Sequence, residues 1–269
     1  MSFVAAPGPG TGGPPAQEDL LSIETVGLRK SFARFEVLRG CDLKVPEGTI
    51  TVVLGPSGTG KSVLLKHIIG VMRPDAGDVL IRGRSVRRMS RAELFRLRRD
   101  IGVMFQDGAL FSSMSVYDNV AFPLRQHTDL KERDIHELVM DQLRAVGLEG
   151  AAGSPPSALS GGMKKRAGLA RALMLDPGIV LCDEPDSGLD PVRTALIGEL
   201  IVERHAAVGG TFVLVTHNIA LAKAVNHYLA LLWKGKIVAA GSTEEIMGLD
   251  DPFVQQFLAG AAEGPLTMN

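Results

Sequence analysis

The chain has 269 residues, of which 45% are hydrophobic and 22% are charged, and its formal net charge is −1. These values are ordinary for a globular protein and exclude wholesale disorder, a collagen-like repeat and a disulfide scaffold. The balanced charge gives no overall field that would attract nucleic acid, so no nucleic-acid partner is expected. The two cysteines, Cys41 and Cys182, lie in apolar stretches far apart in sequence, which indicates a reduced, cytosolic chain.

No apolar run in the sequence approaches the ~20 residues that a membrane-spanning helix requires. The N-terminus does not combine a basic segment with an apolar core, so we expect no signal peptide. Any role at a membrane is therefore expected to depend on a partner.

The N-terminal residues 1–20 are rich in Pro and Gly and predict a disordered tail. Short β-rich runs follow at 23–28, 36–45 and 49–54. The last run, TITVVL, is almost continuously apolar, which is typical of a strand covered on both faces. The pattern then predicts a helix at 63–69, a strand at 79–81 and a short helix opened by the capping box Ser90-Arg91-Ala92-Glu93.

Residues 108–162 differ in character, with few β-rich runs and a helical apolar periodicity over 134–146. We interpret them as a helical subdomain inserted into a sheet domain. Beyond them, strands alternate with helices, with strands predicted at 179–182, 211–215 and 228–232 and helices near 192–205 and 219–224. This alternation implies a parallel sheet with helices on its faces, and hence an α/β fold.

The segment 55–62, here called the phosphate loop, reads GPSGTGKS and fits the pattern G-x-x-x-x-G-K-[ST]. Its glycines let backbone N–H groups surround an anion, and the helix behind it adds a positive N-terminal end. Lys61 supplies a charge for the outer phosphates, and the Ser62 hydroxyl suits a magnesium ligand. The predicted nucleotide-binding residues are Gly55, Pro56, Ser57, Gly58, Thr59, Gly60, Lys61 and Ser62.

Two carboxylates, Asp183 and Glu184, end the apolar strand at 179–182. At the C-terminal edge of a parallel strand, such side chains face the same crevice as the phosphate loop. Asp183 is placed to hold magnesium, directly or through water, and Glu184 to polarise the attacking water.

A second anion site is predicted at Ser160, Gly161 and Gly162, which precede a helix and expose backbone N–H groups. The first turn of that helix carries three cations, Lys164-Lys165-Arg166. Cations are unfavourable at this end of a helix dipole unless an anion sits there.

The order of the motifs GPSGTGKS, Gln106, LSGG, IVLCDEP, SGLD and His217 is similar to that of the ATP-binding-cassette (ABC) ATPases, over about residues 23–247. The resemblance implies an ATPase with a P-loop NTPase fold, an ABC nucleotide-binding domain at 21–250. Its parts would be a mainly parallel core sheet, an antiparallel β subdomain and an inserted helical subdomain at about 108–162. The implied cofactors are ATP and Mg²⁺.

The resemblance also implies a homodimer in which two copies pair head to tail. Each ATP would be held between the phosphate loop of one copy and Ser160, Gly161 and Gly162 of the other, and Asp190 would cross the dimer seam. Phe32 sits where an aromatic ring would lie against adenine, and the nearby Phe35 is an alternative.

The catalytic group implied by the resemblance consists of Glu184, His217 and Gln106. His217 would contact the γ-phosphate and orient Glu184, and Gln106 would sense magnesium and the water. The implied metal ligands are Ser62, Gln106 and Asp183.

Three residues depart from the pattern of many ABC ATPases. Met163 stands where Gln is frequent, Gly188 where Ala is common, and Asp186 where Thr is usual. None of these departures removes a catalytic group, so hydrolysis is expected to survive.

Residues 108–125 and 256–260 look like the corresponding parts of the MlaF/Mkl-type ATPases, which energise lipid transporters built with MCE proteins. This narrower resemblance implies a phospholipid-type cargo and a position at the cytoplasmic face of the inner membrane. The implied partners are two integral-membrane permease subunits, MCE-type lipid-binding proteins and a small accessory subunit.

Two groups of apolar residues are candidates for contacts with such partners, and each also has a purely structural interpretation. The first, in the helical subdomain, either forms core or lines a groove for a permease helix, and consists of Phe111, Met114, Val116, Tyr117 and Phe122. The second is Phe253 and Phe257, at i,i+4 in the C-terminal extension 251–269, which either dock on the partner cassette or belong to a frayed end.

Other functions are weighed against the transporter ATPase. The same cassette can power an importer of amino acids or other small solutes. A soluble cassette protein acting on DNA or ribosomes usually has a long coiled-coil insertion or two cassettes in one chain, and neither is visible here. A regulator that binds nucleotide without hydrolysis would not need Glu184, Gln106 and His217.

Overall fold

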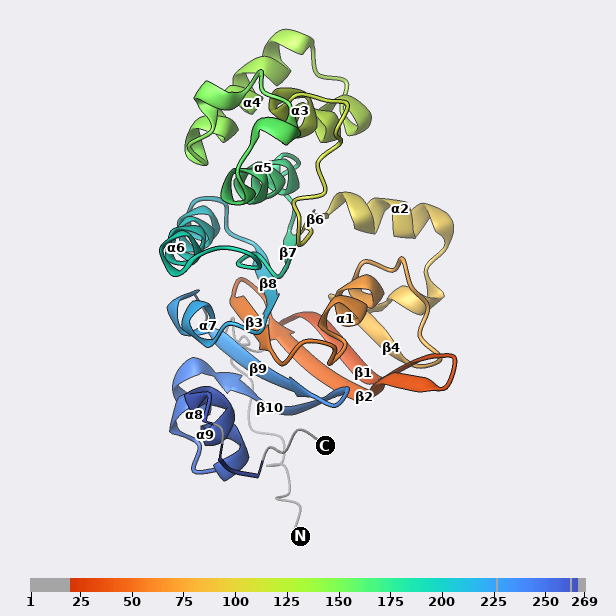
Figure 1. Cartoon of the computed structure of the whole chain (residues 1–269). Coiled ribbons are helices and arrows are strands. Elements are labelled where there is room, and N and C mark those ends of the chain that lie inside the picture. The colour runs from red at the N-terminus through yellow and green to blue at the C-terminus, as the bar shows by residue number, and fades with distance from the viewer. Residues whose placement is uncertain (1–19, 226, 262, 266–269) are drawn as a thin grey trace, which may run out of the picture.

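The computed structural model describes residues 20–225, 227–261 and 263–265, so the predicted tail at 1–20 lies almost wholly outside the described residues. Within this part of the chain the strands form two sheets (Figure 1). The first is antiparallel, in the order β2-β1-β4-β5, and consists of β1 (Leu21–Phe32), β2 (Phe35–Pro46), β4 (Ala76–Ile81) and β5 (Arg84–Ser85).

The second sheet has the order β10-β9-β3-β8-β7-β6. Its members are β3 (Ile50–Leu54), β6 (Ile101–Met104), β7 (Ile179–Asp183), β8 (Thr211–Thr216), β9 (Tyr228–Trp233) and β10 (Lys236–Ser242). Neighbouring strands are parallel except for β10, which pairs antiparallel with β9. The predicted core sheet is therefore mainly parallel, and its carboxyl edge gathers the ends of β3, β6, β7 and β8.

The apolar run in β3 is explained by cores on both faces of the second sheet. Val53 packs in the core that the second sheet shares with the antiparallel sheet, whereas Val52 and Leu54 pack in the core on the opposite face. Helix α1 (Lys61–Ile68) contacts strands of both sheets and buries Leu64 and Ile68 between them. This packing fixes the helix that follows the phosphate loop.

The opposite face of the second sheet is covered by helices α5 (Gly161–Leu173), α6 (Pro191–Val208), α7 (Ile219–Val225), α8 (Thr243–Gly248) and α9 (Pro252–Ala259). In α9, Val254 and Leu258 are buried and Phe253 meets Trp233 edge to face at 5.6 Å between ring centroids. Phe257 also packs on this core. The helix thus belongs to the core of its own chain, and its part in pairing with a second copy stays a prediction.

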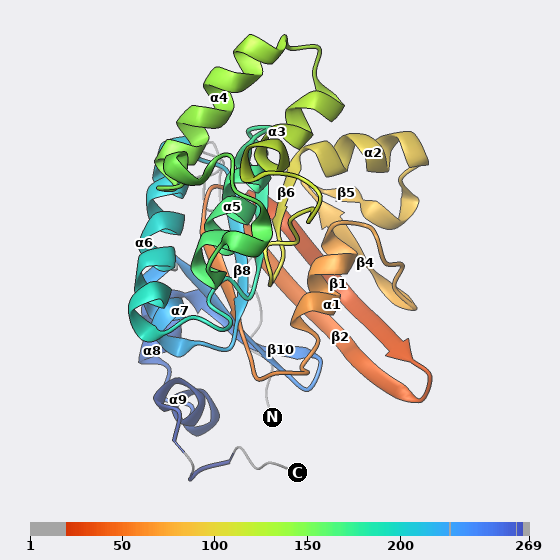
Figure 2. The same cartoon turned by 45° about the horizontal axis from the view of Figure 1, so that its top comes forward.

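Helices α3 (Val116–His127) and α4 (Glu132–Ala145) lie at the end of the molecule opposite α8 and α9 (Figures 1 and 2). With α5 they enclose a third core, which contains Val116, Val139 and Ala167. Helix α5 contacts both α3 and β6, so it joins this helical region to the second sheet. Any movement of α3 and α4 relative to the sheets therefore acts on α5.

Most predicted elements have longer bounds, because pairing and packing extend them beyond the clearest part of each pattern, whereas the strand predicted at 49–54 begins one residue later. The capping box before α2 (Arg91–Arg99) is confirmed, with Ser90 and Glu93 bonding reciprocally. Three strands among the described residues were not predicted, of which β5 has only two residues. The pattern of β6 is only four residues long, and β10 is an edge strand whose residues alternate between half-buried and exposed. None of the helices among the described residues has the length and apolarity needed to cross a membrane.

Candidate functional site

The phosphate loop connects β3 to α1 at the carboxyl edge of the second sheet. Gly60 caps α1 with φ of 101°, a left-handed conformation that favours glycine. The first turn of α1 contains no acidic side chain that would occupy its positive end. The loop and helix therefore present free donors to an anion.

The ammonium of Lys61 lies inside the loop, and its side chain is only 4% exposed. It donates to the carbonyl oxygens of Gly55 at 2.8 Å and Pro56 at 3.0 Å, and it lies 3.4 Å from Glu184 Oε1. A buried cation with two neutral acceptors and one carboxylate is well placed to meet phosphate oxygens.

Ser62 and Asp183 meet from different elements, as predicted for metal ligands. The Ser62 hydroxyl in α1 donates to Asp183 Oδ1 at the end of β7, over 2.9 Å. Burial raises the pKa of Asp183, opposed by the hydrogen bond from Ser62. Among the described residues no cluster of three His, Cys, Asp or Glu side chains forms a cage for a metal. One carboxylate and one hydroxyl beside a phosphate site fit Mg²⁺, which is usually bound by few protein ligands together with substrate phosphates.

Glu184 and His217 are brought together by neighbouring strands β7 and β8. Glu184 Oε1 lies 3.5 Å from His217 Nδ1. The backbone of Glu184 has φ of 45°, a left-handed conformation that costs energy in a non-glycine residue, and its N–H donates to Val215 O at 2.9 Å. The backbone of Glu184 is therefore held in a strained conformation by its hydrogen bond to β8, which fixes the direction in which the side chain leaves the main chain.

Gln106 follows β6, whose pairing with β7 places it beside the acidic turn at 183–187. Its amide Nε2 donates to Ser187 Oγ at 3.0 Å, rather than contacting Ser62 or Asp183. The structure thus brings Gln106 to the edge of the site, and its predicted role as a metal ligand stays a prediction.

Ser160 caps α5 and accepts a hydrogen bond from the backbone N–H of Met163 at 3.3 Å. With Gly162 it lines a cavity of about 550 Å³ that also includes Leu189 and Arg193 and no residue of the phosphate loop. The predicted second anion site is therefore separate from the first within one chain.

Asp190, predicted to cross a dimer seam, caps α6 in its own chain. It accepts from the Arg193 backbone N–H at 2.9 Å and pairs with the Arg193 side chain at 3.3 Å. Phe32 and Phe35 face each other across the tip of the β1–β2 hairpin, which extends away from the core (Figure 2). Phe32 is 44% exposed and Phe35 is 75% exposed, so both rings are accessible to a planar ligand.

Two of the first-turn cations of α5, Lys165 and Arg166, have partners within their own chain, so they are not evidence for the anion predicted at the helix end, which stays a prediction. Lys165 donates to the carbonyl oxygens of Gln106 and Glu184, and Arg166 donates to those of Val146 and Gly147. Sequence spacing could not reveal these bonds, because they depend on the pairing of β6 with β7 and on the packing of α4.

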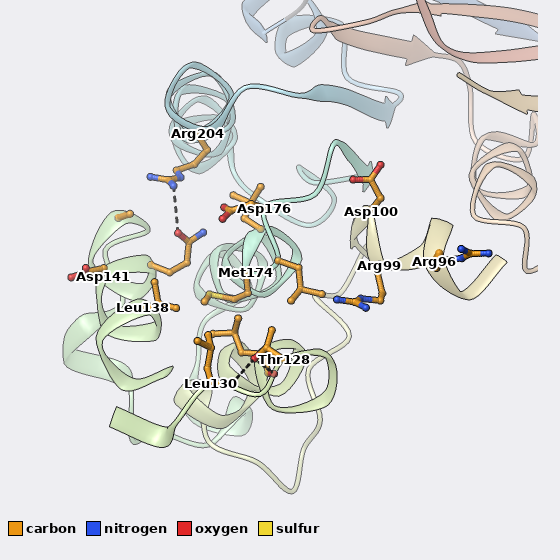
Figure 3. A pocket seen from close by; sticks show the side chains of 15 residues that line it. Arg96, Arg99, Asp100, Thr128, Leu130, Leu138, Asp141, Met174, Asp176 and Arg204 are labelled. Carbon is orange, nitrogen blue, oxygen red and sulfur yellow. Dashed lines mark hydrogen bonds between the residues drawn. The ribbon is translucent and has the colours of Figure 1, made fainter. Parts of the chain in front are cut away.

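A cavity of about 680 Å³ is lined by residues of α2, α4 and α6 and of the C-terminal ends of α3 and α5, and it contains none of the predicted site residues (Figure 3). Arg204 of α6 donates to Gln142 of α4 across it at 3.4 Å. Its walls combine such polar side chains with Leu130, Leu138 and Met174. The cavity is thus distinct from the site at the carboxyl edge of the sheet.

Asp186 is 5% exposed and accepts a hydrogen bond from Thr216 Oγ1 at 2.8 Å, which joins the acidic turn to the segment before His217. We expect Thr216→Val to lower the free energy of unfolding by about 1–3 kcal/mol, because a buried carboxylate loses its donor. Urea unfolding without nucleotide measures this. In an Asp186→Thr background the same change should cost less, and equal losses in both backgrounds would contradict the account.

The fold and the converging motifs define a phosphate-loop ATPase of the ATP-binding-cassette class. The family model described as "ABC transporter" matches residues 38–187. The chain is 46% identical to the intermembrane phospholipid transport system ATP-binding protein MlaF of Escherichia coli (strain K12), covering 83% of this chain and 83% of that protein. It is 49% identical to the probable ribonucleotide transport ATP-binding protein mkl of Mycobacterium leprae, covering 93% and 72%. The chain belongs to the ABC transporter family.

Solved structures agree with this membership. The fold is similar to cbiO1 from Clostridium perfringens, part of the ABC transporter complex cbiONQ, with a TM-score of 0.77, 29% identity and coverage of 89% of this chain and 96% of that one. It is also similar to a dimeric ATP-binding cassette in a post-hydrolysis state bound to ADP and phosphate, with a TM-score of 0.75, 28% identity and coverage of 82% and 98%. The predicted fold class is confirmed, and the chain is an ABC transporter ATPase that binds ATP.

Proposed function

We propose that this ATPase powers phospholipid transport from the cytoplasmic face of the inner membrane. The observation that carries the catalytic assignment is the convergence on Glu184, whose Oε1 lies 3.4 Å from Lys61 Nζ and 3.5 Å from His217 Nδ1. A carboxylate at this edge of the sheet, between a phosphate-binding lysine and a histidine, is placed to act on water at a γ-phosphate.

In the proposed reaction, the phosphate loop and Lys61 hold the β- and γ-phosphates, and Phe32 or Phe35 lies against adenine. Glu184 accepts a hydrogen bond from the attacking water and orients it towards the γ-phosphorus, while His217 contacts the γ-phosphate. The water oxygen bonds to the γ-phosphorus as the bond from that phosphorus to the bridging oxygen of ADP breaks, the water gives a proton to the Glu184 carboxylate or to a phosphate oxygen, and ADP and inorganic phosphate leave. Ser62, Asp183 and Gln106 would hold Mg²⁺, which neutralises charge on the phosphates when bound.

The site is completed, in this proposal, by a second copy of the chain. Ser160, Gly161 and Gly162 lie apart from the phosphate loop of their own chain, with the Ser160 end of α5 exposed. A helix N-terminus of this kind binds a phosphate, so two copies arranged head to tail would each supply it to the other. The dimeric state of the similar solved cassette supports this arrangement.

A groove beside Gln106 supports docking of the two permease subunits. It has a volume of about 340 Å³, and its apolar lining includes Phe105, Phe111 and Phe122. Phe105 and Phe111 are 43% and 44% exposed, and Phe111 packs on Phe122 with ring centroids 4.9 Å apart. Of the five apolar residues proposed above for core or groove, Val116 is fully buried, so that group divides between the two roles. An amphipathic permease helix fits such a groove.

The phospholipid cargo rests on the similarity to MlaF over most of both chains. Partners proposed with it are MCE-type lipid-binding proteins and a small accessory subunit. The mkl protein of similar identity has a ribonucleotide in its name, so a small-solute importer is the alternative.

Reconstitution tests the cargo. The chain is purified from membranes in mild detergent with its bound subunits, which are identified by mass spectrometry and placed in vesicles with fluorescent phospholipid. We expect ATP to drive phospholipid transfer and a Glu184→Gln complex to show none. Two results together would favour the importer. The bound subunits would include permeases but no MCE-type proteins, and ATP would drive the movement of a nucleotide or an amino acid but not of lipid.

A further inference from the structure

Lys165, in the second position after Met163 on α5, is buried beside the backbone of Gln106 and Glu184. Its side chain is 4% exposed, and its ammonium donates to Gln106 O at 2.7 Å and Glu184 O at 3.0 Å. Among the described residues it has no ion pair within 4.0 Å. One side chain thus joins α5 to the main chain at both Gln106 and Glu184.

A buried ammonium is expensive, because it gives up its water shell. Burial lowers the pKa of Lys165, opposed by the carboxylates of Asp186, Asp107, Glu184 and Asp183. The two carbonyl dipoles and these four carboxylates stabilise the charged form of Lys165 and so offset part of the free-energy cost of its burial. A neutral apolar side chain would avoid this desolvation but would donate to neither carbonyl, so the cation is what ties Gln106 and Glu184 to α5.

The rest of α5 is joined to the segment after Gln106. Arg171 donates to the carbonyl oxygens of Ala109 at 2.8 Å and Gly108 at 2.9 Å. A Cβ at Gly168 would lie 2.9 Å from Gly108 Cα, so the two backbones are in close contact. Helix α5 and residues 106–109 therefore form one unit, and Lys165 links that unit to the strained residue Glu184.

The carbonyl that Lys165 holds belongs to the peptide that follows Glu184. The N–H of Glu184 is held by Val215, and its φ of 45° is a conformation that the surroundings must impose. Its carbonyl also accepts from the Ser187 N–H at 3.1 Å. With both peptide groups held, the backbone of Glu184 is held, and with it the direction in which its side chain leaves the main chain.

We propose that Lys165 is a positioning residue that fixes the positions of Gln106 and Glu184 relative to each other and to helix α5. This inference rests on the catalytic role proposed for Glu184. Its consequence is that displacement of the Ser160 end of α5 reaches Glu184 of the same chain directly through Lys165, beside the longer route from Gln106 through Ser187.

The test compares Lys165→Met with Arg166→Met in the full complex, or in the isolated chain if that hydrolyses ATP. Arg166 is a matched control, because it also donates two hydrogen bonds to backbone carbonyls from the same turn but only within the helical region. We expect Lys165→Met to lower kcat on the order of 100-fold, as a small misplacement of a catalytic group does, with KM and the Kd for ATP almost unchanged. Both substitutions should lower the thermal stability by similar amounts, because each removes two hydrogen bonds to backbone carbonyls. Arg166→Met should nevertheless keep the kcat of the parent.

Lys165→Arg supplies a second measurement, since arginine also donates from a cation and should restore most of kcat. Loss of kcat in both Lys165→Met and Arg166→Met, in proportion to stability, would overturn the inference, as would normal kcat in Lys165→Met. Failure of the inference is distinguishable from failure of the proposed function. In the first case Glu184→Gln is inactive while Lys165→Met is normal, and in the second Glu184→Gln itself hydrolyses ATP normally.

Discussion

Glu184→Gln is expected to bind ATP with nearly the affinity of the parent while kcat falls about 100- to 10,000-fold. The amide has the size of the carboxylate, so the surroundings of Lys61 and His217 change little. It accepts a hydrogen bond from water poorly, and without turnover the ATP-bound dimer should accumulate. Phosphate release measures the rate, and size-exclusion chromatography with ATP and Mg²⁺ measures the dimer.

Glu137→Gln is the matched control, because Glu137 is an exposed carboxylate on α4, in the helical region and outside the site. It should behave as the parent in both measurements. Hydrolysis by Glu184→Gln at a near-normal rate would refute the catalytic assignment. A variant that neither hydrolyses nor binds ATP would instead give Glu184 a role in binding.

Lys61→Ala should weaken ATP binding by about 2–3 kcal/mol, or roughly 30- to 150-fold in Kd. The substitution removes a buried cation and its hydrogen bonds to the carbonyl oxygens of Gly55 and Pro56, of which Pro56 keeps the bond from the Thr59 hydroxyl. It also removes the charge that faces the outer phosphates. Titration with a fluorescent ATP analogue measures the change in affinity directly, apart from any loss of turnover.

Lys66→Ala, in the last turn of α1, is the control, because Lys66 has the same charge but is exposed and lies away from the loop. Its Kd should match that of the parent. Unchanged ATP affinity in Lys61→Ala would mean that Lys61 does not hold phosphate. An equal loss in both variants would point to long-range charge rather than contact.

The sequence was sufficient for the elements with strong local patterns and for the motifs that they carry. The phosphate loop, the strand before Asp183 and the capping box at Ser90 are each specified by adjacent residues. The meeting of Ser62 with Asp183 followed from the rule that parallel strands bring their carboxyl ends to one edge.

Features that depend on tertiary packing were not accessible in this way. Lys165 and Arg166 are neighbours in an ordinary run of cations, yet they bond to different parts of the fold. Strand β6 is too short to have a clear pattern and forms because β7 lies beside it. Asp186 appeared only as a departure from the family, and its bond with Thr216 shows that it holds two site segments together.

The separation of Ser160 from Lys61 within one chain has a consequence for kinetics. If each copy carries one part of two different nucleotide sites, the number of complete sites depends on the fraction of the chain that is dimeric. Specific activity of the isolated chain should then rise steeply with protein concentration and fall on dilution. Permeases that hold two copies side by side would abolish this dependence, so assembly in the membrane would itself act as the switch that turns the enzyme on.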